Sequence, residues 1–297
     1  MFSNMTMELD FYLLDNMKKI LISYGTADFN FTLKRLKKEA EILQLFDTII
    51  FYGPKNLPDY IRSNPLMAFK KGGGFWLWKP YVIWKTLQDY PDSIVVYVDA
   101  GCSLNPSEDW NTYFNYMNDF NTVLFHYRDD FDYKWDQGFK TNSAKVKCWT
   151  KSETLNYFDT LFNDASWRDY NKIMGGFIIS KSNKNIFIED WLKVSMFKPE
   201  LIVDPFEIEK SNQETYFSEH RHDQSIITPI GHYFSQYRKN EVLIIPETSE
   251  SKLNTAAVGA NRNKIQKDKK VTVKTRIIQF TKSIIGEKLY NRIRFWS

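Results

Sequence analysis

Short runs of β-branched and aromatic residues alternate along the chain with segments in which apolar residues recur every three or four positions. The runs predict strands buried on both faces of a sheet, and the spaced segments predict amphipathic helices. The predicted strands cover residues 20–24, 47–52, 94–98, 121–125, 173–179 and 242–246. The predicted helices cover residues 31–46, 80–90, 109–120, 150–162 and 183–196. This alternation favours an α/β fold of one domain with a mixed, mostly parallel central sheet.

Two of the predicted helices carry local start signals. Pro80 suits the first turn of a helix, where its missing N–H costs nothing. Thr150 followed by Glu153 three positions later predicts a capping box at the start of the helix that ends near Phe162.

The strand at 94–98 ends abruptly in Asp99-Ala100-Gly101. A carboxylate followed by two small residues at the carboxyl end of a buried strand is the position at which open α/β sheets bind ligands. The alternative interpretation is a turn in which Asp99 caps the backbone and Gly101 supplies a positive φ. This stretch alone supports both interpretations equally.

Glycines mark two further segments. Gly72-Gly73-Gly74 is followed at once by Trp76 and Trp78, so the backbone there can turn sharply or approach a ligand closely. The segment lacks the GxxxxGK[ST] spacing of a phosphate-binding P-loop, and a hinge with buried tryptophans is the structural alternative. Gly175-Gly176 stands at the entry of the strand predicted at 173–179 and allows a similar close approach.

The densest polar cluster is Glu219-His220-Arg221-His222-Asp223-Gln224. In the structural interpretation Asp223 starts a helix, and in the functional one a carboxylate and an imidazole face the ligand site beside Asp99. Zinc binding by the two histidines is disfavoured because only His232 lies nearby as a third ligand.

Composition narrows the class of protein. The chain has 297 residues, 43% of them hydrophobic, which is ample for a large core. Two cysteines give neither a disulfide framework nor a metal cluster and favour a reducing compartment. The N-terminus carries acidic residues and no basic leader, which argues against a secretory signal, and Met17 is a candidate start after an extension of residues 1–16.

Charge is distributed unevenly. From Arg262 onward there are eleven Lys and Arg against two acidic residues, whereas residues 1–261 hold 29 basic and 34 acidic residues, a net charge of −5. Residues 277–296 repeat apolar side chains at helical spacing with basic residues between them. Such a helix is typical of a membrane-surface anchor, and nucleic-acid binding is disfavoured because no recognition motif accompanies it. The predicted organisation is a domain at 17–250 and a linker with a basic amphipathic tail at 251–297.

The ordered set of motifs resembles bacterial GT-A-type, nucleotide-sugar-dependent glycosyltransferases that build capsule or lipopolysaccharide. The motifs are GGGFWLWKPY at 72–81, VYVDAGC at 96–102, GGFII at 175–179 and HDQS at 222–225. The resemblance implies a GT-A-like, Rossmann-like domain over roughly residues 18–246.

The resemblance also implies roles for individual residues. Asp99 matches the first acid of the D-x-D motif, which contacts the nucleotide ribose and often a divalent cation, Mn²⁺ or Mg²⁺. Gly101 stands where the second acid, the usual metal ligand, would be, which puts metal dependence in doubt. Without a metal, Lys79, Lys70 or Arg221 would have to supply positive charge to the leaving diphosphate.

Further matches concern the donor and the catalytic centre. Tyr24, Gly25 and Thr26 match the segment bordering the nucleotide base, and Gly175 and Gly176 match the floor on which the two sugars meet. Asp223, with His222 before it, matches the late acidic motif that carries the catalytic carboxylate.

The expected function is transfer of a sugar from a nucleoside-diphosphate donor to a cell-surface glycan or lipid-linked acceptor. The tail would hold the enzyme peripherally on the cytoplasmic face of the inner membrane. A non-catalytic protein that binds nucleotide sugars or glycans is the first alternative. A sugar nucleotidyltransferase is the second, although Gly25-Thr26-Ala27-Asp28 lacks the Gly-rich basic signature it would need.

Overall fold

The computed structural model describes residues 17–133, 141, 143–252 and 255–260. Its internal contacts divide the chain into residues 1–262 and 263–297. Residues 1–16 and 261–297, which hold the predicted N-terminal extension and the predicted basic amphipathic tail, lie outside the described residues.

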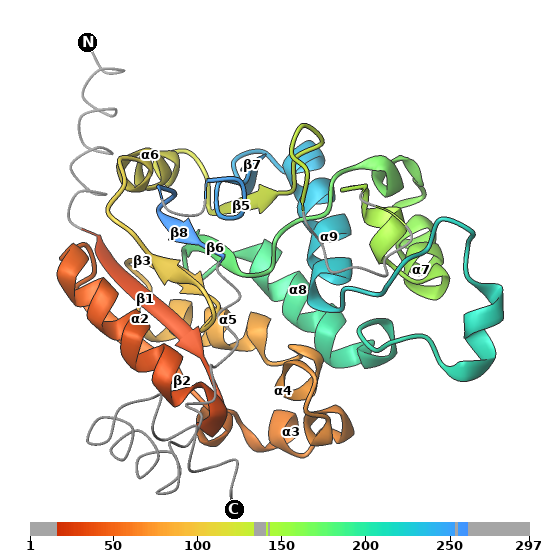
Figure 1. Ribbon diagram of the computed structural model, residues 1–297, viewed down its shortest axis with the longest axis horizontal. Coiled ribbons are helices and arrows are strands. Elements are labelled where there is room, and N and C mark those ends of the chain that lie inside the picture. Colours follow the sequence, from red (N-terminus) through yellow and green to blue (C-terminus); the bar gives the residue numbers. More distant parts are fainter. Residues whose placement is uncertain (1–16, 134–140, 142, 253–254, 261–297) are drawn as a thin grey trace, which may run out of the picture. The chain divides into compact units, whose positions relative to one another are not determined.

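A six-stranded mixed sheet forms the centre of the domain (Figure 1), with the strand order β2-β1-β3-β6-β5-β7. Three neighbouring pairs are parallel, and β6 runs antiparallel to both β3 and β5. The strands are β1 (Lys18–Tyr24), β2 (Thr48–Tyr52), β3 (Ser93–Val98), β5 (Thr122–His126), β6 (Phe177–Lys181) and β7 (Val242–Pro246), and a separate antiparallel pair joins β4 (Ser103–Leu104) to β8 (Val258–Gly259). The predicted mixed, mostly parallel α/β sheet is confirmed.

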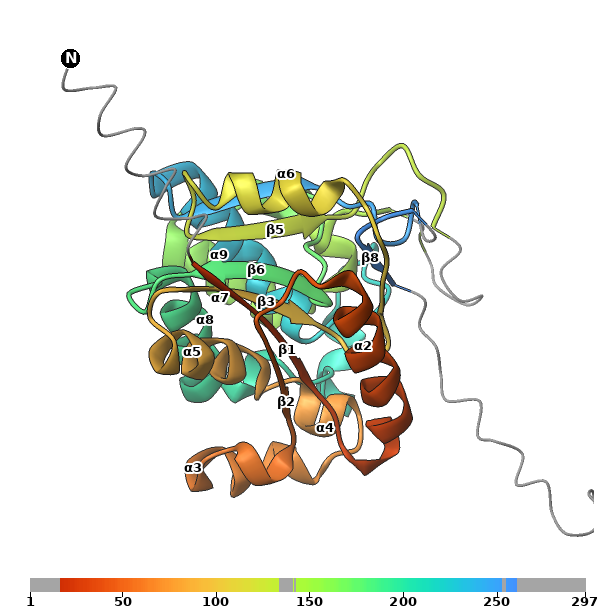
Figure 2. The same ribbon diagram turned by 90° about the vertical axis from the view of Figure 1, so that its left-hand side faces the viewer.

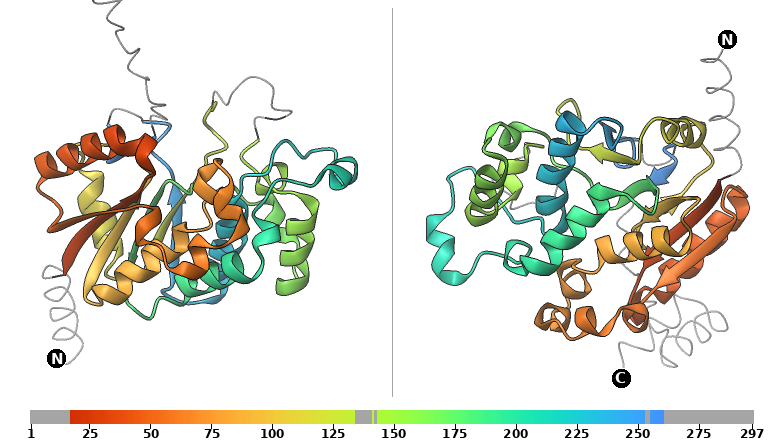
Figure 3. Two further views of the ribbon diagram at one scale, coloured as in Figure 1. Left: turned by 90° about the horizontal axis from the view of Figure 1, so that it is seen from below. Right: turned by 180° about the vertical axis from the view of Figure 1, so that it is seen from behind.

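Helices cover both faces of this sheet (Figures 2 and 3). They are α2 (Asn30–Leu43), α3 (Asp59–Arg62), α4 (Gly72–Phe75), α5 (Lys79–Asp89), α6 (Asp109–Tyr116), α7 (Ser152–Phe162), α8 (Ile186–Phe197) and α9 (Asp223–Tyr237). One hydrophobic core joins the sheet to α5, α7, α8 and α9. The core on the other face joins it to α2 and α6.

Strand periodicity explains this division. Ile20 and Ile22 point into the core with α5 and α8, whereas Leu21 between them points into the core with α2. In β3, Val95 and Tyr97 face the first core, and the alternate residues face the second. Successive side chains of a strand point to opposite faces, so a strand covered on both sides must be apolar throughout.

Three sequence expectations need correction. The capping box at Thr150 is wrong, because α7 begins at Ser152 and Lys151 takes the N-cap position without a side-chain cap. The backbone N–H groups of Lys151 and Ser152 instead donate to His220 and Gln213, which come from a distant loop. Tertiary partners thus replace the local cap.

The strand predicted at 173–179 begins only at Phe177, after the two glycines. Before them, Ile173 forms an isolated bridge to His126.

The predicted linker starts too early. Residues 256–258 are buried, and β8 pairs with β4, so the domain continues to residue 260. Within the described residues no helix has the length and apolar character needed to cross a bilayer.

Candidate functional site

The topology directs several loops to one edge of the sheet. β1, β3, β5 and β7 all run the same way, so their carboxyl ends meet at this edge. β6 runs the opposite way, which places its first residues there as well. A cavity of about 470 Å³, hereafter the larger cavity, opens among these loops. Its size and its place at the carboxyl ends of strands are those of small-molecule sites in α/β proteins.

Aromatic rings form one wall of the larger cavity. The rings of Tyr24 and Trp78 stack with centroids 3.7 Å apart, and both line the cavity. Burial raises the pKa of Tyr24 to about 12, so its hydroxyl stays protonated. Gly25 and Thr26 follow Tyr24 along the same wall. Flat, rigid apolar surfaces of this kind can pack against a nucleotide base or a sugar ring.

The glycine-rich segment forms a left-handed turn against this wall. All five residues from Gly72 to Trp76 have φ between 55° and 99°, including the non-glycine residues Phe75 and Trp76. A left-handed conformation costs roughly 1–2 kcal/mol for each L-residue that has a Cβ. Trp78 helps to hold the turn by donating from Nε1 to the Gly72 carbonyl at 3.0 Å. Neither a P-loop nor a simple hinge describes this segment.

His222 is strained in the same place, with φ 51° and ψ −113°. Its ring lies 5.2 Å from that of Phe75 and 5.5 Å from that of Trp76, measured between centroids. Three non-glycine residues in disfavoured conformations therefore pack together. Such strain persists only where the surrounding structure enforces it, and it concentrates at functional sites.

Lys79 lies at the centre of the site. It is the first residue of α5, and its side chain is 1% exposed. Its Nζ donates to Asp223 Oδ2 at 2.5 Å and to the Gly175 carbonyl at 2.9 Å, and it lies 3.3 Å from Asp99 Oδ1. The two predicted site carboxylates thus meet at one ammonium group.

The charge of this cluster follows from its burial. Burial disfavours the charged form of Lys79, but Asp223 and Asp99 outweigh it and raise the pKa above its ordinary value. Burial also raises the pKa of Asp223, against the lowering effect of Lys79. The site therefore holds a permanent cation beside a carboxylate that is more basic than usual. A more basic carboxylate is a better proton acceptor in general acid–base catalysis.

Gly175 and Gly176 make room for the two carboxylates. A Cβ on Gly175 would lie 2.5 Å from Asp223 Oδ2, and one on Gly176 would lie 3.2 Å from Asp99 Oδ2. The sequence predicted a close backbone approach at this pair, and the approaching groups are the protein's own carboxylates. Gly101 differs, because a Cβ there would meet nothing within 4 Å.

A second cavity of about 140 Å³, hereafter the smaller cavity, adjoins the first. Asp223, His222 and Lys79 line it, and it shares Asp99, Trp76, Arg221 and Gln224 with the larger cavity. Asp99 has a side chain that is 37% exposed, whereas that of Asp223 is only 8% exposed. Asp99 therefore stands at the boundary of two compartments, and Asp223 lies at the inner end of one.

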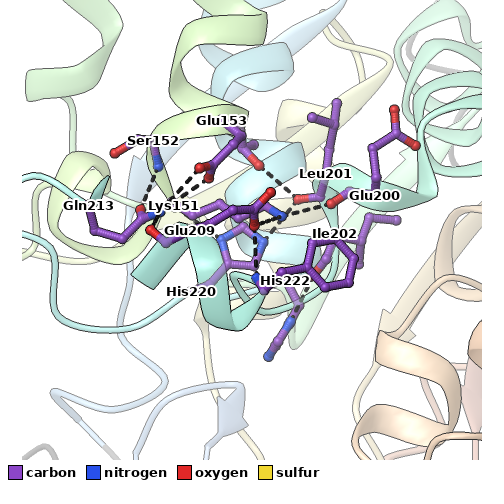
Figure 4. Close-up of polar contacts among 12 residues, drawn as sticks. Lys151, Ser152, Glu153, Glu200, Leu201, Ile202, Glu209, Gln213, His220 and His222 are labelled. Carbon is purple, nitrogen blue, oxygen red and sulfur yellow. Dashed lines mark hydrogen bonds and ion pairs between the residues drawn. The ribbon is translucent and has the colours of Figure 1, made fainter. Parts of the chain in front are cut away.

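Two histidines fasten the loop before α9 to its neighbours, and one of them, His220, reaches the N-terminus of α7 (Figure 4). His220 accepts the Lys151 N–H at Nδ1 and donates from Nε2 to the Leu201 carbonyl at 2.9 Å. His222 donates from Nδ1 to the Ile202 carbonyl at 2.8 Å. Burial lowers the pKa of His220 well below its usual value and that of His222 to about 4, so both rings are neutral.

These bonds leave His220 with no nitrogen for zinc, and His232 Nε2 is similarly engaged with the Asn171 carbonyl. His222 Nε2 faces Asp204 at 3.6 Å. The histidines therefore do not form the zinc site that the sequence disfavoured. The catalytic role of His222 stays a prediction, and the structure places its ring on the wall of the smaller cavity.

A divalent cation does not fit the residues around Asp99. Asp99 Oδ1 accepts from Tyr97 at 2.5 Å and also faces the ammonium of Lys79. Gly101 offers no side-chain ligand, and the part of the chain that the structure describes contains no group of three His, Cys, Asp or Glu residues placed for a metal. A metal ion on Asp99 would also lie beside the ammonium of the buried Lys79, and like charges repel.

Sequence reasoning missed one basic residue of the site. Lys172 is 2% exposed, lines the larger cavity and lies 3.5 Å from the ring centroid of Tyr127. It follows the irregular segment 163–171 and belongs to no motif. Arg221 and Lys70, which the sequence did single out, also line this cavity.

Comparison with known proteins gives weak matches. No protein-family model and no curated protein matches the sequence. Among solved structures, a glycosyltransferase involved in glycosylation of the major capsid of PBCV-1 has a TM-score of 0.36 at 10% identity, covering 77% of this chain and 82% of that one.

Mouse xyloside xylosyltransferase 1 has a TM-score of 0.39 at 9% identity, covering 77% of this chain and 84% of its own. The galactosyltransferase LgtC has a TM-score of 0.34 at 12% identity, and the match covers 76% of this chain and 72% of the LgtC chain. Similarities of this size carry no argument about activity, which has to be inferred from the residues of the site.

Proposed function

We propose that the chain is a glycosyltransferase that moves a sugar from a nucleoside-diphosphate donor to a cell-surface glycan or lipid-linked acceptor. The observation that carries the proposal is the pair of adjoining cavities with Asp99 at their boundary and Lys79 joining it to Asp223. A transferase of this class needs two substrates to meet at one reactive centre, and this arrangement supplies two compartments and one shared centre.

The larger cavity suits the donor. Tyr24 and Trp78 offer a stacked aromatic wall for the base, and Asp99 offers a carboxylate for sugar hydroxyl groups. Gly176 brings the backbone close to Asp99, so a sugar can lie over both. These contacts favour a ligand with an aromatic end and a polyhydroxyl part.

The smaller cavity suits the acceptor hydroxyl. In the reaction, the acceptor oxygen bonds to the anomeric carbon, the bond from that carbon to the phosphate oxygen breaks, and the hydroxyl proton leaves. Asp223 can take this proton if it acts as a base. In a retaining course it would instead lie beside the anomeric carbon. The anomeric configuration of the product, read by NMR, distinguishes the two courses.

A variant series tests the proposal by separating binding from transfer. Nucleoside-diphosphate sugars should raise the melting temperature of the wild type, because a ligand that binds only the folded state stabilises it. Asp223→Asn should keep this binding and lower transfer by about 10²- to 10⁴-fold, the usual contribution of general acid–base catalysis. Asp99→Ala should weaken donor binding itself.

Asp89→Asn, at a partly exposed carboxylate on α5, is the control and should change neither property. Equal transfer by wild type and Asp223→Asn would contradict the assigned role. Donor binding by a wild type that neither transfers nor hydrolyses the sugar would indicate a binding protein instead.

The location of the enzyme remains part of the proposal. The eleven basic residues from Arg262 onward and the apolar spacing within 277–296 favour a tail that lies on the cytoplasmic face of the inner membrane. A lipid-linked acceptor would be presented at that surface.

A further inference from the structure

We propose that Lys172 and Arg221, fixed against Trp149, hold the diphosphate of the donor in place of a divalent cation. This inference rests on the proposed function, because it concerns the leaving group of the same reaction. Both residues line the larger cavity, and both cations lie 4.9 Å from a ring of the same indole.

Hydrogen bonds of the backbone fix the main chain at both residues before any ligand arrives. The Lys172 N–H donates to the Ala144 carbonyl at 2.9 Å, and its own carbonyl accepts from Tyr127 at 3.0 Å. The Arg221 N–H donates to the Trp149 carbonyl at 3.0 Å. The side chains themselves lie against rings, and donors placed by the fold in advance need less reorganisation when charge develops, which favours electrostatic stabilisation.

Aromatic faces contact both charges. Lys172 Nζ lies over Tyr127 as well as Trp149, and ring faces attract cations. Glu219 lies 3.0 Å from Arg221 Nε and orients the guanidinium. A guanidinium is the group best matched to phosphate oxygens, because its N–H donors form a planar fork.

The alternative, a metal on Asp99, conflicts with the contacts already described. Lys79 and Tyr97 occupy one carboxylate oxygen, and position 101 provides no second ligand. Lys79 itself cannot take over the phosphate role that the sequence suggested without leaving Asp223 and Asp99. When the bond to the anomeric carbon breaks, its electron pair stays on the phosphate oxygen, and Lys172 and Arg221 stabilise that charge.

The experiment measures binding of uridine and guanosine diphosphate by calorimetry, in EDTA and in Mn²⁺. We expect the dissociation constant of the diphosphate that binds to differ less than twofold between the two conditions. Lys172→Met and Arg221→Met should each weaken binding at least tenfold in EDTA, and Lys172→Arg should restore most of it. Recovery in the arginine variant excludes misfolding as the cause.

Lys147→Met is the matched control. Lys147 also packs over an aromatic ring, that of Tyr216 at 5.4 Å, but it lies outside both cavities. Its removal should leave binding unchanged. Binding that disappears in EDTA and returns with Mn²⁺ would overturn the inference while preserving the proposed function. Undiminished binding in the methionine variants would also overturn it. Absence of any diphosphate or nucleotide-sugar binding would instead remove the proposed function.

Discussion

Lys79 is the residue on which the site depends, because it compensates two carboxylates that would otherwise repel each other. All three of its N–H donors have an acceptor: Asp223, the Gly175 carbonyl and Asp99. A buried pair adds little net stability compared with apolar residues, but removing one partner leaves a buried charge uncompensated. The cluster is therefore sensitive to single substitutions.

Lys79→Met should lower the free energy of unfolding by about 3–5 kcal/mol, the cost of breaking a buried ion pair. Lys85→Met is the control, since Lys85 lies on the same helix and its side chain is 39% exposed beside Asp89. An exposed pair contributes about 0–1 kcal/mol. Urea denaturation of both variants makes the comparison, and equal losses would contradict the central role of Lys79.

Gly175→Ala should destabilise the protein and abolish transfer, because its Cβ would lie 2.5 Å from Asp223 Oδ2. Asp223 would have to move away from Lys79. Gly101→Ala, where the new Cβ meets nothing within 4 Å, should change the melting temperature little. Thermal unfolding and a transfer assay measure both variants. A destabilised Gly101→Ala with an unaffected Gly175→Ala would refute this account.

At the scale of elements, two irregular segments hold the site together with the first residues of α5 and α9. The left-handed turn at 72–76 presents Trp76 to the ring of His222, and the loop before α9 is tied to α7 by His220. Strain in the turn is offset by buried contacts across the segment. Both segments are held by neutral imidazole rings, which makes them sensitive to acid.

Stability should therefore fall as pH drops from about 6.5 to 4. Burial lowers the pKa of His222 and of His232 to about 4, below the unfolded value of about 6.5. Between these values the unfolded state binds the proton and the folded state does not. The free energy of unfolding therefore contains the full contribution of each neutral ring above pH 6.5. That contribution, on the order of 3 kcal/mol for each ring, is lost as the pH falls towards 4.

His232→Gln isolates the contribution of one histidine to the pH dependence of stability. The glutamine amide can still donate to the Asn171 carbonyl, and position 232 lines neither cavity. Its unfolding free energy should depend less steeply on pH over this interval. Urea denaturation at a series of pH values measures the slope. An unchanged slope would show that His232 already binds its proton in the folded state.

At the scale of the whole molecule, the direction of β6 decides where the site forms. As the one antiparallel strand among the six, it delivers Gly175 and Gly176 to the edge at which the other loops end. The β4–β8 pair then brings Val258, and Ala260 just after β8, to the lining of the larger cavity. The site is thus built from almost the full length of the domain.

The basic tail makes a separate prediction. Deleting the residues after 265 should reduce sedimentation with vesicles that contain anionic lipid and should spare transfer to a soluble acceptor. The physical reason is the loss of nine basic residues and of the apolar residues that recur at helical spacing. Unchanged sedimentation of the truncated protein would exclude the tail as the anchor.

The amino-acid sequence by itself determined the α/β class, the approximate positions of the strands and helices, and the presence of a carboxylate at the end of β3. These properties follow from local periodicity, because a strand or helix reveals its buried face in its own spacing. The exceptions were local signals that tertiary contacts overrode. At the predicted capping box of Thr150, for example, the helix begins at Ser152, and the Lys151 N–H donates to the distant His220.

Only the tertiary structure showed which groups meet. Lys79 and Asp223 are 144 positions apart, and their contact depends on strand order and on the packing of α5 against the sheet. Lys172 belongs to no motif, and only the fold brings it to the larger cavity, against the rings of Tyr127 and Trp149. Local patterns state that a side chain is buried but not what it is buried against, and the chemistry of this site lies in those partners.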